Sequence, residues 1–164
     1  MRNDADFVAY LAARWPFLVR SLVLIGCPRH EAEDVARTAL ARCYGAWEQV
    51  LEADDVDVVV YRIVLDGWHR SRRRRWWAHA PTAELPETIP VADLSDAVLL
   101  RQALEAELAR LAPEDREVLV LRFAAGLAEA QVADVLEVPL ADVRARVSAA
   151  LAAIDLAALG EMSR

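Results

Sequence analysis

Five arginines and three tryptophans lie within ten consecutive residues, from Trp68 to Trp77. Arginine neutralises phosphate and stacks on bases, and indole rings provide platforms for unpaired bases. These residue types therefore predict a surface that binds opened or partly opened DNA. A second interpretation stays open, in which the run is a solvated basic helix end whose last two tryptophans cover the core. The candidate DNA-binding residues here are Trp68, Arg70, Arg72, Arg73, Arg74, Arg75, Trp76 and Trp77.

A second candidate DNA-binding segment lies at residues 127–147, where two short stretches with helical apolar spacing flank the break Glu137-Val138-Pro139. These are the dimensions of a helix-turn-helix, which places its second helix in the major groove. Arg144, Arg146 and Ser148 lie on that predicted recognition helix. The alternative is an ordinary helical hairpin, which matches the same pattern.

Residues that do catalysis or hold metals form no convincing group in the sequence. Cys27 and His30 have ligand-like spacing, but no second pair completes a zinc site. None of the three histidines has a serine or cysteine neighbour at a spacing that would make it a nucleophile, and no glycine-rich phosphate loop is present. The sequence thus predicts that the protein is not an enzyme and has no metal or cofactor. Cys27 and Cys43 are interpreted as core residues.

The charge is distributed unevenly along the chain, which has 19 arginines, no lysine and a net charge of -7. Residues 1–80 hold 12 arginines and 11 carboxylates, a net of +1, whereas residues 81–164 hold 7 and 15, a net of -8. An apolar content of 56% argues against a disordered chain. No apolar run is long enough to predict a membrane span, and no signal-peptide pattern opens the sequence, so we expect a cytoplasmic protein.

The elements that must position these residues are all predicted to be helices. In the first half, we expect helices from Asp6, from Pro16 to Ile25 and from His30 through Trp47. Residues 56–68 are rich in β-branched side chains, but no second strand exists to pair with them, so helix is favoured there too.

In the second half, helices are expected over 96–111, from Pro113 to Gly126, over 128–136 and from residue 140 to about 159. Three prolines between residues 81 and 90 indicate a semi-extended linker. The predicted fold is therefore all-α, with an N-terminal domain (1–78), a linker (79–95) and a helix-turn-helix domain (96–164).

Three stretches together resemble the extracytoplasmic-function (ECF) RNA polymerase sigma factors of the compact actinobacterial type. Residues 31–47 are similar to the family's polymerase-binding helix, residues 60–77 to its promoter-melting segment, and residues 111–123 to the entry of its C-terminal helix-turn-helix. The order and spacing of the three are more specific than any one of them.

The resemblance implies a protein that binds core RNA polymerase and directs promoter recognition and opening. The DNA-binding residues would be those of the two segments above. An anti-sigma factor is left open as a further partner, because family members are often controlled that way. The polymerase-binding residues that the resemblance implies are Asp34, Arg37, Leu40, Tyr44 and Trp47.

The chain departs from the family pattern most clearly in the helix-turn-helix. Ala128 stands where a serine N-cap is usual, and Glu137 where a turn glycine is usual. Asp142 places a carboxylate at the start of the recognition helix, which opposes phosphate, and Asp66 does the same in the melting segment. The alternative function is therefore a degenerate sigma-like protein that acts through protein–protein contacts without selecting promoters.

Overall fold

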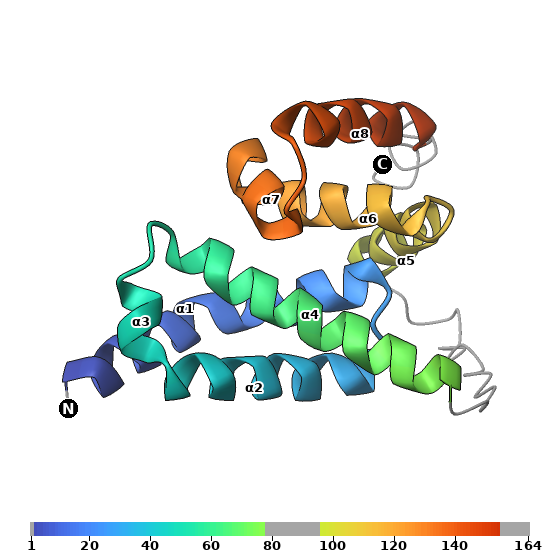
Figure 1. Ribbon diagram of the computed structural model, residues 1–164. Helices are drawn as coiled ribbons and strands as arrows, with labels where there is room; N and C mark the ends of the chain where they lie inside the picture. Colours follow the sequence, from blue (N-terminus) through green and yellow to red (C-terminus); the bar gives the residue numbers. More distant parts are fainter. Residues whose placement is uncertain (1, 78–95, 155–164) are drawn as a thin grey trace.

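The computed structural model describes residues 2–77 and 96–154, and its regular structure over these ranges is helical, which confirms the all-α prediction (Figure 1). The N-terminal helices are α1 (Arg2–Ile25), α2 (Arg29–Gly45), α3 (Trp47–Leu51) and α4 (Val56–Trp77). The C-terminal helices are α5 (Asp96–Ala109), α6 (Pro113–Leu119), the π-helix η2 (Val120–Ala124), α7 (Glu129–Leu136) and α8 (Leu140–Ala153). The predicted linker and the predicted end of the last helix near residue 159 lie outside the described residues.

Helix α1 runs unbroken through Pro16, so the predicted start of a new helix at this proline is wrong. Proline removes one backbone hydrogen bond, that to the carbonyl of Ala12. Both Pro16 and Ala12 face solvent, where water can satisfy that carbonyl. Leu11 before the proline and Leu18 after it both pack into the core, which holds the helix together across the proline.

Helix α1 is also long and apolar enough to cross a membrane, by length and composition alone, over residues 4–25 with a mean hydropathy of 1.5. No apolar run of this length was predicted from the sequence. In this fold the apolar residues of its second half pack against α2, α4 and η2, with Leu18 and Leu22 fully buried. Packing in the core thus accounts for part of the apolar character of α1.

Helix α4 confirms that the β-branched stretch is helical. Its buried side chains Tyr61, Val64, Leu65 and Trp68 recur at steps of three and four residues, and the helix packs against α1 and α2. The Asp55 carboxylate accepts a hydrogen bond from the Val58 backbone N–H at 3.1 Å, which caps the first turn.

Glu137 lies in the turn of the helix-turn-helix, with φ 56° and ψ 43°. Among the described residues it is the one non-glycine residue with a positive φ. The turn therefore requires the left-handed conformation that glycine adopts most easily. At the start of α7, Ala128 offers no side-chain cap. Gln131 compensates in part, because its Oε1 accepts the Ala128 backbone N–H at 2.7 Å.

The C-terminal helices pack directly onto the N-terminal ones, as Figure 1 shows for α7 above α4. One hydrophobic core continues across both sets, from Leu18 and Trp68 to Val118 and Val143. Polar contacts join the sets as well. Arg62 donates to the Asp134 carbonyl at 2.5 Å, and Gln131 Nε2 donates to the Asp55 carboxylate at 2.6 Å.

Two further contacts cross between the helix sets near the end of α1 and the middle of α4. His69 Nε2 donates to Glu117 Oε1 at 2.5 Å, and Arg116 donates to the Leu24 carbonyl. Burial lowers the pKa of the Arg116 guanidinium. The two helix sets are thus packed against each other in this structure.

Candidate nucleic-acid interface

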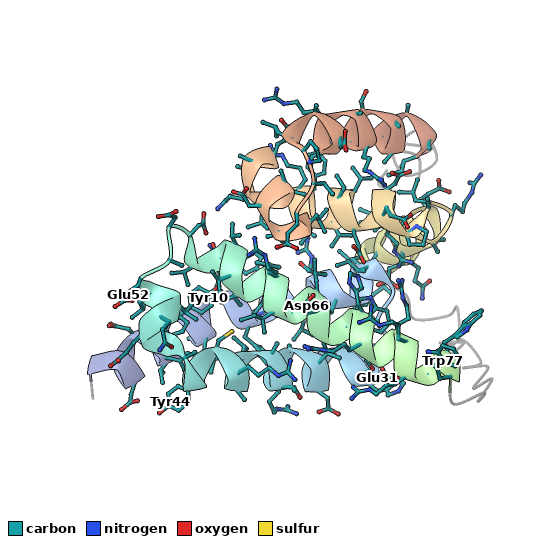
Figure 2. The ribbon with its side chains drawn as sticks, in the orientation of Figure 1. Tyr10, Glu31, Tyr44, Glu52, Asp66 and Trp77 are labelled. Atoms are coloured by element: carbon teal, nitrogen blue, oxygen red, sulfur yellow. The ribbon has the colours of Figure 1, made fainter. Side chains whose placement is uncertain are left out.

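The predicted DNA-binding run occupies the last three turns of α4, where its residues divide into two groups. Trp76 and Trp77 are 81% and 78% exposed, so the interpretation that they cover the core is wrong. Trp68, by contrast, is 3% exposed and belongs to the core. Figure 2 shows Trp77 pointing away from the helices at the end of α4. Two large indole side chains are therefore mostly exposed to water.

The arginines of this run are mostly without internal partners. Within the described residues no carboxylate pairs with Arg70, Arg72, Arg73 or Arg74. Arg75 differs, because it binds the Glu31 carboxylate at 2.7 Å and lies over the Trp68 ring at 5.1 Å. We define the basic-aromatic surface as Arg70, Arg72, Arg73, Arg74, Trp76 and Trp77.

Asp66 is the one carboxylate of α4 close in sequence to this surface. It is exposed one turn before Arg70 and pairs with no described cation. A carboxylate here repels phosphate, so it marks one border of the region that an anionic ligand can cover.

The residues predicted to bind polymerase lie on α2 and the start of α3, and they too divide by burial. Asp34, Arg37 and Tyr44 are exposed. Arg37 binds Asp34 at 2.8 Å, and the Tyr44 hydroxyl donates to Asp4 at 2.9 Å. Leu40 and Trp47 are each 3% exposed, so in this structure they pack beneath the α2 face instead of lying on it.

The predicted DNA-binding residues of α8 do not share one face. Arg144 binds Glu129 of α7 at 3.0 Å, whereas Arg146 lies 3.5 Å from Asp115 of α6. Ser148 is exposed and lies one turn after Arg144. Both arginines are therefore partly neutralised by carboxylates of neighbouring helices, which the sequence pattern did not reveal.

The two cysteines are buried and unpaired, as their interpretation as core residues requires. Burial raises the pKa of Cys27 to about 12 and that of Cys43 to about 11, so both thiols stay protonated at neutral pH. Among residues 2–77 and 96–154, no three metal-ligating side chains lie close enough together to hold a metal ion.

Comparison with known proteins gives the class of this chain. Residues 101–154 match the family model "Sigma-70, region 4". The chain is 30% identical over 157 residues to "RNA polymerase sigma-E factor" of Streptomyces coelicolor, covering 93% of this chain and 85% of that protein. It is 28% identical over 151 residues to the protein of the same name from Streptomyces avermitilis, covering 90% of this chain and 82% of that one.

Two solved structures share the fold. CnrH, solved in complex with the cytosolic domain of CnrY, aligns with a TM-score of 0.68 at 21% identity, covering 98% of this chain and 91% of that one. The sigma factor RpoE from Bartonella quintana, solved with the anti-sigma factor NepR, aligns with a TM-score of 0.74 at 18% identity, covering 96% of each chain.

The chain is thus similar along nearly its whole length to RNA polymerase sigma factors, and it shares its all-α fold with two proteins of solved structure. The chain belongs to the ECF sigma factors of RNA polymerase. Its role in transcription initiation follows from that membership, and the degenerate sigma-like alternative is not favoured. Members of this family are not enzymes.

Proposed function

We propose that the basic-aromatic surface binds the opened strand of promoter DNA while the protein is bound to core RNA polymerase in the cytoplasm. The observation that carries this assignment is the exposure of Trp76 and Trp77 beside four arginines that have no partner within the described ranges 2–77 and 96–154. Unpaired bases stack on the indoles, and the arginines bind the phosphates between them. A duplex offers no unstacked bases, so the surface prefers opened DNA.

The exposed face of α2, with Asp34, Arg37 and Tyr44, is proposed to bind core polymerase. Leu40 and Trp47 act from beneath it by fixing the helix. Helix α8 is proposed to contact duplex DNA upstream, with Arg144 and Ser148 on one side of the helix and Arg146 on another. An anti-sigma factor is a further expected partner, supported by the two structural neighbours, which were both solved as complexes with other proteins.

The DNA assignment is tested with the full-length chain and two fluorescent DNAs, one single-stranded and one duplex of equal length. The variant Arg72→Ala/Arg73→Ala removes two unpaired charges. If both contact single-strand phosphates, the log–log slope of affinity against salt concentration falls by about 1.4 units. The control is Arg20→Ala, which removes an exposed arginine of α1 that has no partner in the part of the chain that the structure describes.

Equal slopes for the double variant and the control would refute the DNA role of this surface. The wider function is tested by run-off transcription with purified core polymerase on genomic DNA. Specific start sites are expected from the wild-type chain, and Trp76→Ala/Trp77→Ala is expected to reduce their yield while leaving polymerase binding intact.

A further inference from the structure

An open groove of about 520 Å³ runs between α2 and α4 on the side away from the C-terminal helices. Its walls come from Val35, Thr38 and Arg42 of α2 and from Ile63, Arg70 and Arg74 of α4. No residue of the helix-turn-helix lines it. The groove is therefore accessible while the two helix sets stay packed together.

Gly67 keeps the floor of this groove open. The nearest heavy atom to a Cβ at this position would be Cγ1 of Val35, at 3.6 Å, so the glycine leaves room for a methyl group between the helices. Glycine in a helix interior weakens the helix. At this position it also leaves an empty space between two helices that otherwise pack along much of their length.

The charge of the groove is positive and largely uncompensated. Arg42, Arg70 and Arg74 have no ionic or hydrogen-bonding partner within the described residues. The two carboxylates at its rim are already occupied. Glu31 binds Arg75 at 2.7 Å, and Asp34 binds Arg37 at 2.8 Å.

Arg42 belongs to α2 and therefore lies outside the arginine run of α4. It stands in the last turn of α2, where a cation is stabilised by the negative end of the helix dipole. Together with Arg70 and Arg74 it places guanidinium groups on both sides of one groove.

We propose that this α2–α4 groove binds the sugar–phosphate backbone of single-stranded DNA, with Arg42 as a phosphate-binding residue. The proposal rests on the proposed function, because Arg70 and Arg74 belong both to the groove and to the basic-aromatic surface. A strand whose bases stack on Trp76 and Trp77 continues from there into the groove.

The size and walls of the groove favour a single strand over other anionic partners. A volume of about 520 Å³ is that of a pocket for a small organic molecule, which admits a nucleotide or two but no duplex. The apolar walls formed by Val35 and Ile63 suit a base or sugar, and guanidinium groups stack on bases as well as bind phosphate.

The test measures binding of a fluorescent single-stranded oligonucleotide to the full chain over a series of salt concentrations. Three variants are compared with wild type: Arg42→Ala in the groove, Arg72→Ala/Arg73→Ala outside it, and the control Arg20→Ala. We expect Arg42→Ala to lower the salt slope for the single strand by about 0.7 unit. Its effect on a duplex of equal length should match that of the control.

The outcomes separate this proposal from the one on which it rests. If Arg42→Ala behaves as the control while the double variant lowers the slope, the groove assignment is wrong and the basic-aromatic surface stands. If neither changes the slope, both fail. A last outcome concerns polyglutamate as a competitor at equal charge concentration. If polyglutamate displaces the oligonucleotide, and Arg42→Ala weakens the binding of polyglutamate as much as that of the oligonucleotide, the groove binds acidic protein and the DNA assignment is overturned.

Discussion

Glu137 in the helix-turn-helix is a non-glycine residue with a φ of 56°, so its replacement tests whether the turn is strained. An L-residue in this left-handed conformation costs about 1–2 kcal/mol. Replacement by glycine removes that cost but increases the entropy of the unfolded chain, which offsets about 0.5–1 kcal/mol.

The variant also loses the contact between Glu137 and Arg62, whose charged atoms lie 3.9 Å apart. This pair is worth little, because the two side chains are 75% and 41% exposed, and solvent screens such pairs to a few tenths of a kcal/mol. The net expectation for Glu137→Gly is a gain of about 0.5 kcal/mol in the free energy of unfolding. For a chain of this length, that raises the melting temperature by about 1–2 °C.

The measurement is urea or thermal unfolding of the full chain, with Glu137→Ala as the matched control. Alanine removes the same ion pair but keeps the backbone strain, so its stability should equal or fall slightly below that of wild type. Glu137→Asn should lie between the two, since asparagine tolerates the left-handed region better than most residues. A glycine variant no more stable than the alanine variant would refute the claim that the turn is strained.

Three further predictions follow from single sites. Gly67→Ala should raise the free energy of unfolding by about 0.5–1 kcal/mol, measured by urea unfolding, because the new methyl group meets its nearest heavy atom at an ordinary 3.6 Å. Glu129→Gln should strengthen duplex binding, measured by fluorescence anisotropy, because it releases Arg144 from a carboxylate at 3.0 Å; no change would remove Arg144 from the DNA-binding residues. The thiols of Cys27 and Cys43 should resist alkylation at pH 8 until the protein is unfolded. Because their folded pKa values are raised to about 12 and 11, the stability they contribute is complete below about pH 8.5 and is lost as the pH rises through the folded pKa values.

Most of the helical fold was predictable because apolar spacing is a local signal. The β-branched stretch of α4 was predicted to be helical for another reason, because no second strand was found to pair with it. The family resemblance pointed to the turn as well, because Glu137 stands where a glycine is usual and the structure gives this residue a positive φ. The continuity of α1 through Pro16 was not predictable, because it depends on which face of the helix the rest of the fold buries.

The candidate site was only partly predictable for a related reason. Residue types identified the arginine–tryptophan run. Only the structure shows that Trp76 and Trp77 are exposed on the surface and that Trp68 is buried in the core. The periodicity of α2 could have separated Leu40 from Arg37 in advance. The partners of Arg144 and Arg146 lie on α7 and α6, so only the tertiary arrangement reveals that both arginines are partly neutralised.

The packing of α7 on α4, secured by the contacts of Arg62 and Gln131, has a consequence for binding equilibria. Some partners would bind only molecules in which the two helix sets have separated, here called open molecules. Such a partner can bind only the fraction of the population that is open. Its apparent dissociation constant is the intrinsic one divided by that fraction, so a protein that is about 1% open binds about a hundredfold more weakly. Residues that never touch such a partner therefore set how tightly it binds.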